Sequence, residues 1–454
     1  MNQADPFNKA GVTKSLLSFS LPATAALMAQ ALHNMVDRVL IGQAVGPTGL
    51  AGITVCLPFT LIVTAFGVLV GLGAAIRISI HLGQHDRLAA ARVLGNALSL
   101  LICLAAIPTV VGLTFSDPIL RLCGADDAVL PYARDYLRFM AIGSVFQMIG
   151  FGLNAAIRAT GNPRTAMAVT LVSILINSSL AFLFILGLQL GIQGAAMATV
   201  VAQLVPAVWS IGHFCCPSRR LTLRLGNLKL DRSIVVAILA VGTPSFAAMI
   251  GASLVNAVIN NRLAGYGGVL DITAMGLLYT IVLMIATPVF GLNQGAQPLI
   301  GYNYGAGQFE RVRKTMAIAI ALGVGVTASG FAIMMLFPGP VFSIFCPHDD
   351  RVVALATKAA RTSLMMLPLV GFQIVGTSYF QAVGRTVVAL LLTISRQILL
   401  LIPALVILPI LLGVQGVWLA IPLSDLCSAV LTGVLLAAEF RRLRRVEHCR
   451  VLTA

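Results

Sequence analysis

The chain has 454 residues, of which 58% are hydrophobic and only 10% are charged, and its mean hydropathy is +0.96. Soluble domains carry about 25% charged residues, so this composition excludes an ordinary soluble protein. The formal net charge of +15 could indicate nucleic-acid binding, but the placement of the basic residues, described below, argues against that partner.

Twelve long apolar segments fill almost the whole chain, and each is long enough for a membrane-spanning helix, which needs about 20 apolar residues. A β-barrel would show short alternating segments instead. The first segment is too long for the core of a signal peptide, and no small-residue cleavage site follows it. The expected spans are 15–41, 51–80, 93–115, 131–157, 165–187, 192–214, 233–262, 271–298, 314–337, 359–382, 386–410 and 414–438.

The second six segments repeat the first six about 222 residues later. The recurring residues include Pro22 and Pro244, Asn34 and Asn256, Gly73 and Gly295, and Gly83 and Gly305. Repeated halves usually form two lobes around a site near the membrane midplane. A polar, basic stretch from Cys215 to Arg232 separates the halves. We therefore expect an N-terminal lobe at 1–218, a cytoplasmic linker at 219–232 and a C-terminal lobe at 233–454.

Most of the Lys and Arg residues fall in segments that lie inside the cell if the N-terminus is cytoplasmic. This asymmetry predicts a multi-pass protein of the plasma (inner) membrane with both termini in the cytoplasm. The terminal cluster from Arg441 to Arg450 then lies against anionic lipid headgroups, and no nucleic-acid partner is expected.

The cysteines form no Cys-x-x-Cys pair. Cys123 and Cys346 occupy similar places in the two halves, which leaves a disulfide open, although lobes that must move should not be joined covalently. No P-loop, HExxH or GxSxG pattern is present, so we expect no enzyme, no cofactor and no metal site.

Two acidic residues lie clearly inside spans, Asp37 and Asp425. A charge at the bilayer centre costs about 2.5–3.5 kcal/mol on insertion scales, which favours a role for each. Gln30, Asn34 and Asp37 share one helical face and predict a polar stripe that faces a cavity. Asp37 is the candidate cation-coupling residue, with a structural ion pair or cap as the alternative.

Arg396 and Asp425 lie on neighbouring spans with opposite charges and predict an intramembrane ion pair, structural rather than catalytic. Glu439 stands beside Arg441 and Arg442, and we expect it at the inner interface. His33 and His81 are expected to be interfacial or hydrogen-bonded, not metal ligands.

A substrate cavity is predicted from polar, Met and Phe residues on several spans, because flexible Met and aromatic surfaces suit varied apolar ligands. Plain helix packing remains the alternative for the Met and Phe positions. The candidates are Gln30, Asn34, Met148, Phe151, Asn154, Gln203, Asn256, Asn260, Met284 and Gln294.

Several motifs together resemble the MATE family of multidrug and toxic compound extrusion transporters. They are Leu21-Pro22, the run Asn34 to Arg38, Ile41-Gly42-Gln43, the run Gly301 to Gly307, and the Gly-x-Gln-Gly-x-x-x-Ala turns that begin at Gly191 and Gly413. The similarity covers essentially the whole chain and is greatest to prokaryotic (DinF-like) branches with the coupling acid on the first span. Members with paired acids in spans seven and ten match less well, because Asn256, Asn260 and Gln373 are the polar residues there.

This resemblance implies an all-α fold of twelve transmembrane helices in two six-helix bundles that form a V. It implies a monomeric secondary antiporter that exports amphipathic, cationic small molecules by alternating access, driven by a proton or sodium gradient.

The resemblance also places a cation site at Asp37, Asn177, Thr199 and the carbonyl of Ala195. A second acid of the family's site is absent, because the residue is Ala181. Sodium prefers several charged oxygen ligands, so the proton is favoured and sodium stays open. Ordinary interhelical hydrogen bonding is the alternative role for Asn177 and Thr199.

A flippase for a lipid-linked saccharide is the competing function, since polysaccharide exporters share a similar bundle. Such flippases usually line their cavity with Arg or Lys, whereas the stripe here is acidic and rich in amides. An integral-membrane enzyme would need clustered His, Asp or Glu near one interface, which the sequence does not show.

Overall fold

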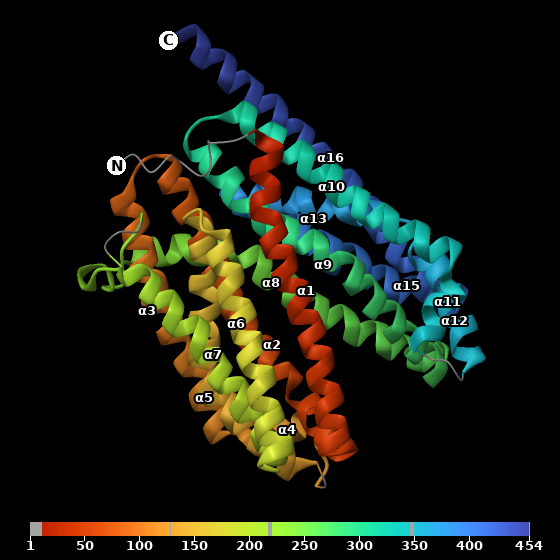
Figure 1. The fold of residues 1–454 in the computed structure, drawn as a ribbon. Coiled ribbons are helices and arrows are strands. Elements are labelled where there is room, and N and C mark those ends of the chain that lie inside the picture. The colour runs from red at the N-terminus through yellow and green to blue at the C-terminus, as the bar shows by residue number, and fades with distance from the viewer. Residues whose placement is uncertain (1–10, 128, 217–219, 346–348, 454) are drawn as a thin grey trace. The chain divides into compact units, whose positions relative to one another are not determined.

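The computed structural model describes residues 11–127, 129–216, 220–345 and 349–453, and all regular structure in these ranges is helical (Figure 1). Within them, 11 helices are long and apolar enough to cross a membrane, and 12 spans result if one bent pair is a single span. The prediction of an all-α polytopic membrane protein is confirmed.

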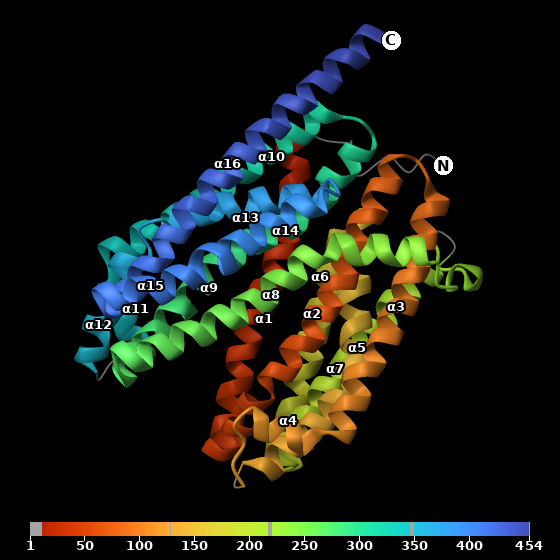
Figure 2. The ribbon, with the colours of Figure 1, turned by 180° about the vertical axis from the view of Figure 1, so that it is seen from behind.

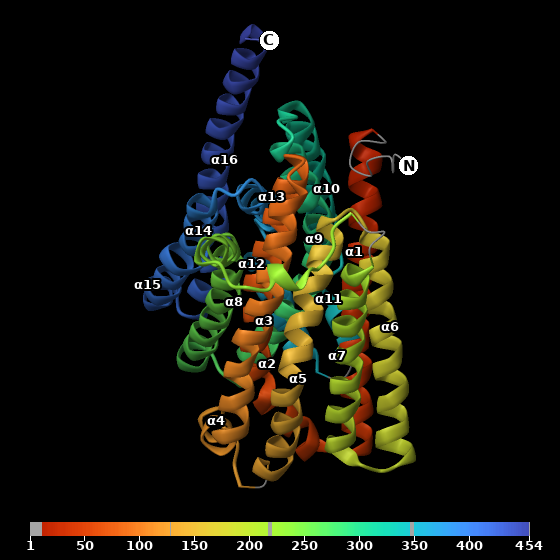
Figure 3. The same ribbon diagram turned by 90° about the vertical axis from the view of Figure 1, so that its left-hand side faces the viewer.

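Among the described residues of the first half, there are seven α-helices and two short segments of other helix types. They are α1 (Val12–Ala44), α2 (Pro47–Gly83), α3 (Arg87–Thr114), α4 (Ser116–Leu122), α5 (Leu130–Ala159), α6 (Pro163–Ala181), the π-helical η1 (Phe182–Gly187), α7 (Gly191–Cys215) and the 3₁₀ turn η2 (Leu225–Asn227). Figure 3 shows α2, α3, α5, α6 and α7 running side by side.

In the part of the second half that the structure describes, there are nine α-helices and one π-helical segment. They are α8 (Arg232–Tyr266), α9 (Val269–Gly305), α10 (Phe309–Leu336), α11 (Pro338–Phe345), α12 (Asp350–Ser363), α13 (Leu367–Ala382), α14 (Thr386–Ile394), the π-helical η3 (Ser395–Leu401), α15 (Ile402–Leu412) and α16 (Val414–Thr453). In Figure 2, α13 packs beside α10 and α16, and the last turns of α16 extend past its neighbours.

The tenth span differs from its expected form. The sequence predicts one helix over 359–382, but α12 and α13 meet at a break and are bent by 57°. Pro368 follows the break and cannot donate a backbone hydrogen bond to the preceding turn, which is why the helix restarts there.

The short turns, like the spans, recur in both halves. Gly161 and Gly384 both have positive φ, as do Gly191 and Gly413. The left-handed region is open to glycine at little cost, so these residues reverse the chain at matching places in both halves. The duplication is thus visible in the backbone.

Packing divides the chain into two compact units. The N-terminal unit is Ala25–Phe246, and the C-terminal unit is Met1–Thr24 together with Ala247–Ala454. Both borders fall two residues after a proline within a helix, Pro22 in α1 and Pro244 in α8. The lobes 1–218 and 233–454 and the linker 219–232 describe the sequence repeat, and they stay a prediction.

In the N-terminal unit, the first part of α8 packs directly on α2. A Cβ added to Gly73 would come within 2.1 Å of the carbonyl oxygen of Ile238, and one added to Gly242 within 1.8 Å of that of Leu69. Because no side chain fits in so small a space, these glycines allow the two backbones to touch.

The C-terminal unit repeats this arrangement with the first part of α1 on α9. A Cβ on Gly295 would lie 2.5 Å from the backbone nitrogen of Ser20, and one on Gly291 would lie 2.3 Å from Oγ1 of Thr24. The hydroxyl of Ser20 donates to the carbonyl of Leu292 at 3.2 Å. These contacts explain why the start of each half belongs to the other compact unit.

The connection between the halves is docked on α3. The side chain of Asn96 donates to the carbonyl of Asn227 at 3.4 Å and accepts from the backbone N–H of Asp231 at 2.7 Å. The hydroxyl of Ser99 donates to the carbonyl of Leu228 at 2.7 Å. This part of the expected linker therefore has fixed hydrogen-bond partners.

The possible disulfide is not tested. Cys123 is a half-buried free thiol, and Cys346 lies outside the described residues.

Candidate cation-coupling site

An apolar cluster in the N-terminal unit holds three helices together. It contains Leu40 and Ile41 of α1, Ala181 of α6, and Ala195 and Ala198 of α7. Alanine on α6 and α7 lets the helix backbones approach closely, as is common in membrane bundles. Ala181, where a sodium-type site would carry a second acid, is fully buried in this cluster.

Each candidate site residue lies about one helical turn from a member of this apolar cluster. Helices α1 and α6 run parallel in this region, and α7 runs back after a short turn. Asp37 precedes the cluster by one turn on α1, Asn177 precedes Ala181 by one turn on α6, and Thr199 follows Ala195 by one turn on α7. All three therefore lie within about one turn of the cluster; we call them the polar layer, and their contact with one another stays a prediction.

Within this layer, several oxygens remain open to a ligand. Asn177 is only 8% exposed, and its Oδ1 has no hydrogen-bond partner in the described part of the chain. The hydroxyl of Thr199 donates to the carbonyl of Ala195 at 2.9 Å, which leaves the lone pairs of the hydroxyl oxygen available. Asp37 is half-buried. The arrangement suits a group that binds a proton or a small cation.

Three neighbours of this layer were not among the sequence candidates. Nδ1 of His33, one turn before Asp37, lies 3.1 Å from Oγ of Ser178, which is next to Asn177. Tyr136 of α5 is buried within electrostatic range of Asp37. The hydrogen-bonded role expected for His33 is confirmed. Its four-residue spacing from Asp37 is the signal that links it to the site.

The polar stripe on α1 is present as an internal contact. Nε2 of Gln30 donates to Oδ1 of Asn34 at 3.1 Å, and Asn34 is exposed. These two residues are accessible to a ligand.

Gln203 belongs to a chain of amides inside the N-terminal unit. Its Nε2 lies 3.4 Å from Oε1 of Gln147, whose own Nε2 donates to the hydroxyl of Thr64 at 2.9 Å. Oε1 of Gln203 is buried and has no hydrogen-bond partner within the described ranges. The chain links α7, α5 and α2.

The other candidates on α5 are packed into the helix bundle. Met148 is fully buried, and Phe151 is half-buried. The side chain of Asn154 donates to the carbonyl of Ala166 at 2.9 Å and accepts from Arg158, which ties α5 to α6. The structure therefore gives Met148 and Asn154 packing contacts, and their role toward a substrate stays a prediction.

The remaining cavity candidates lie in the C-terminal unit. Asn260 and Met284 are exposed, and Asn256 and Gln294 are half-buried. Their membership of one cavity with residues of the N-terminal unit stays a prediction.

The expected charge pair of the C-terminal unit is in contact. Nε of Arg396 donates to Oδ1 of Asp425 at 3.0 Å, and Asp425 is buried. Gln373 also donates to the backbone carbonyl of Asp425. Arg396 lies in the π-helical segment η3, a backbone feature that the sequence did not indicate. Whether the pair serves only structure stays a prediction.

Glu439 is more enclosed than the sequence suggested. Its side chain is 1% exposed and forms an ion pair with Arg385, from the turn before α14, while Arg442 lies 4.0 Å away. The main partner of Glu439 is therefore Arg385, which is distant in sequence, rather than its basic neighbours in sequence.

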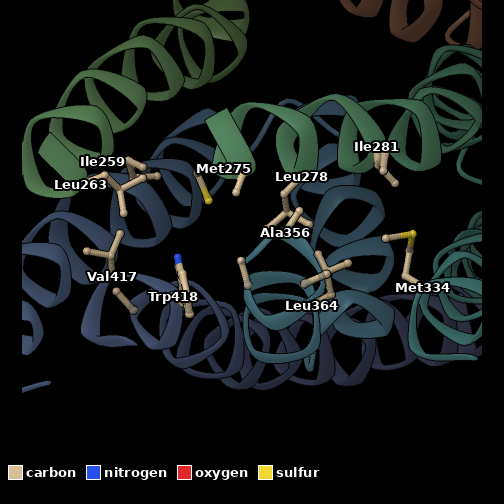
Figure 4. Packing of buried hydrophobic residues seen from close by; sticks show 14 of the residues in the cluster. Ile259, Leu263, Met275, Leu278, Ile281, Met334, Ala356, Leu364, Val417 and Trp418 are labelled. Atoms are coloured by element: carbon tan, nitrogen blue, oxygen red, sulfur yellow. The ribbon is translucent and has the colours of Figure 1, made fainter. Parts of the chain in front are cut away.

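The repeat gives each site residue a counterpart in the C-terminal unit. Asp37, Ala195 and Thr199 correspond to Ile259, Val417 and Ile421. Ile259 and Val417 belong to one hydrophobic core cluster, shown in Figure 4, and Ile421 packs against it. Apolar packing thus takes the place of Asp37, Ala195 and Thr199 in the C-terminal unit, whereas Leu399, the counterpart of Asn177, is exposed.

Three comparisons with known proteins agree with this fold. The MatE family model matches residues 22–183 and 244–407. Multidrug export protein MepA of Staphylococcus haemolyticus is 26% identical over 423 residues, 93% of each chain. The ligand-bound structure of the MATE multidrug transporter DinF-BH is 34% identical, with a TM-score of 0.88 over 96% of this chain and 97% of that one. An outward-facing multidrug resistance MATE family transporter of the MOP superfamily has a TM-score of 0.91 at 23% identity, over 98% and 99% of the two chains.

Duplicated halves of membrane-spanning helices with buried polar groups are the typical architecture of a membrane transporter. The chain belongs to the MatE family, whose model covers most of both halves, and it is a transporter rather than an enzyme. The resemblance drawn from the motifs is confirmed, and the similarity to DinF-BH is in keeping with the prokaryotic branch named there.

Proposed function

We propose that this protein is a secondary active antiporter that exports amphipathic, cationic small molecules, with Asp37 as the coupling residue. The curated relatives named multidrug export proteins support the export of drug-like compounds. The ligand bound in the structure of DinF-BH supports a small-molecule substrate. The duplicated architecture suits an alternating-access mechanism, in which the substrate is exchanged for an ion.

This proposal is supported by three polar residues within spans, Asp37, Asn177 and Thr199, each about one turn from a member of the same apolar cluster. A carboxyl group within a span is costly to insert and is retained where it binds an ion, a proton or a substrate. In one protonation state Asp37 is neutral, and in the other it attracts a cation. Proton and cationic substrate can therefore compete for the same site.

The proton is the driving ion that the side chains favour. Sodium is held best by several oxygens with charge among them, and the place of a second carboxylate is taken by Ala181, packed among apolar groups. Asp37 alone suffices for a proton. Asn177 and Thr199 offer acceptors to its protonated form.

The orientation follows from the basic residues. The excess of Lys and Arg on one side supports a place in the plasma (inner) membrane with both termini in the cytoplasm. The basic end of α16 carries Arg441, Arg442, Arg444 and Arg445, which suit contact with anionic lipid headgroups. Each monomer has both halves of the repeat, and we propose that it works alone.

A flippase for lipid-linked saccharides is the second candidate. A pyrophosphate-bearing lipid needs basic groups in the cavity, whereas the polar layer here carries a carboxylate and an amide. This charge favours a cationic substrate.

Transport by the purified protein in proteoliposomes tests the proposal. A pH gradient without sodium should drive accumulation of ethidium, and a sodium gradient at equal pH should not. Transport that follows the sodium gradient alone would reverse the assignment of the ion. Failure with ethidium and other cationic dyes, together with translocation of a fluorescent lipid-linked saccharide, would favour the flippase.

A further inference from the structure

His33 occupies an unusual position on α1. Between Leu27 and Val39, a stretch that the structure describes throughout, it is the only buried side chain. Its neighbours Leu32, Met35 and Val36 are each at least half exposed. In this region of α1, His33 is therefore the main side chain that fixes how the helix packs against its neighbours.

The partner of His33 belongs to the coupling site. Nδ1 of His33 lies 3.1 Å from Oγ of Ser178 on α6, a hydrogen bond in which either atom can donate, depending on the tautomer. Ser178 adjoins Asn177, and Asp37 follows His33 by one turn. Residues four apart lie on the same helical face, so the bond holds the face of α1 that carries Asp37 toward α6.

The register agrees with the apolar contacts nearby. Leu40 and Ile41 of α1 pack with Ala181 and Ile185. The first two residues follow His33 by seven and eight positions, and the other two follow Ser178 by three and seven positions. Asp37 lies between the two contacts. It is therefore held from one end by apolar packing and from the other by a single hydrogen bond.

The C-terminal unit solves the same problem differently. The residue that corresponds to His33 is Val255, which is buried in the hydrophobic core cluster that also contains Leu405. In that unit, the matching helices are held together by apolar packing in this cluster. The polar contact of His33 thus occurs in the half that carries the acid.

We propose that His33 is a positioning residue of the coupling site: its hydrogen bond to Ser178 fixes the middle of α1 against α6 and holds the face of α1 that carries Asp37 toward α6. The inference rests on the proposed coupling role of Asp37. Among the described residues, the charged group one turn along the same helix is Asp37, Tyr136 on α5 lies near Asp37, and the contact from α6 is the neutral Ser178.

The test uses the full-length protein in detergent and measures two quantities. The first is the Kd for ethidium, followed by fluorescence, and the second is the number of protons released when ethidium binds, followed with a pH indicator. In His33→Leu and in Ser178→Ala, proton release should fall clearly below that of the parent, because Asp37 is no longer held toward α6, while the Kd changes less than about twofold. The double variant should be no worse than either single variant, because both remove one contact.

Conservative variants separate positioning from a general packing defect. The amide of Asn reaches the place of Nδ1, so His33→Asn should restore proton release. The longer Gln reaches the place of Nε2, so His33→Gln should not. Ser178→Thr keeps the hydroxyl and should behave as the parent.

Parent-like proton release in both His33→Leu and Ser178→Ala would overturn the positioning role, as would equal release by the Asn and Gln variants. If His33→Leu does not fold, Ser178→Ala alone decides. Asp37→Asn is measured alongside. Unchanged release in that variant would overturn the proposed function itself, whereas loss in Asp37→Asn with no loss in the His33 and Ser178 variants would overturn only the role of His33.

Discussion

At the positions that the 222-residue repeat relates, the N-terminal unit carries Asp37 and Thr199 where the C-terminal unit carries Ile259 and Ile421. The first pair belongs to a polar layer, and the second pair packs in or against a hydrophobic core cluster. The same helix arrangement can therefore hold either polar residues or a hydrophobic core at these positions. The side chains at a few positions decide which one forms, because a membrane bundle tolerates polar groups only where they find partners.

The C-terminal unit does carry an acid, but in another setting. Asp425 lies one turn beyond Ile421 on α16 and is bonded to Arg396. Asp37 has no Lys or Arg in a salt bridge among the described residues, whereas Asp425 has one. An acid without a basic partner is free to change its charge during a cycle, and a paired one is held in place. This contrast leads to four predictions.

The largest effect is expected at Asp37. Asp37→Asn should insert and fold as the parent does but lose export driven by a pH gradient, with ethidium transport in proteoliposomes falling to that of empty vesicles. The exposed acid Asp350 supplies a control, and Asp350→Asn should transport normally. Full export by Asp37→Asn would show that the acid of the N-terminal unit does not couple transport.

Placing an acid at the matching position of the other unit should damage the fold instead. Ile259 is 5% exposed, so Ile259→Asp buries an unpaired carboxyl group and should lower the free energy of unfolding by several kcal/mol. The loss is read as a lower midpoint of thermal unfolding in detergent. Ile259→Val, which removes one methylene group, should cost only about 1 kcal/mol. A stable Ile259→Asp protein would mean that this core accepts water or a cation.

The pair of Arg396 and Asp425 should contribute to stability. Arg396→Ala leaves the buried carboxylate of Asp425 alone, which costs about 3–5 kcal/mol; Asp425→Ala leaves the half-buried Arg396 and should cost less, and the charge-swapped double variant should recover part of the loss. Thermal unfolding of the purified proteins measures both. Two single variants as stable as the parent would show that the contact carries no structural role.

The smallest effect is expected from Ala181→Asp, which adds an acid to the coupling site of the N-terminal unit. Sodium should then raise the midpoint of thermal unfolding of the variant, because a bound ion stabilises the folded state, but not that of the parent. Ala181→Ser, which adds only a hydroxyl group, serves as the control. A parent protein already stabilised by sodium would contradict the preference for the proton.

Much of the architecture could be predicted before any coordinates. The spans follow from the lengths of apolar runs, because a backbone in lipid must satisfy its own hydrogen bonds and does so as a helix. The candidate acid followed from the polar face of Gln30, Asn34 and Asp37. The contact of Arg396 with Asp425 followed from two opposite charges on neighbouring spans.

The break between α12 and α13 and the π-helical segments could not be predicted from apolar runs, because hydropathy is the same in a straight and in a bent helix. Glu439 was expected among its basic neighbours in sequence, but the fold gives it Arg385 as a partner. Such pairs join residues far apart in the chain, and their choice depends on how the helices rotate about their own axes.

The sequence by itself determined a duplicated set of membrane-spanning helices and an acid, Asp37, within the first span, since these depend on composition and local spacing. Only the tertiary structure decided that the helices exchange units near Pro22 and Pro244, that Ala181 packs in an apolar cluster with Leu40 and Ile41, and that His33 is bonded to Ser178. The physical reason is that these features arise from contacts between helices, where the register and close approach of backbones such as those at Gly73 and Gly242 set which side chains meet.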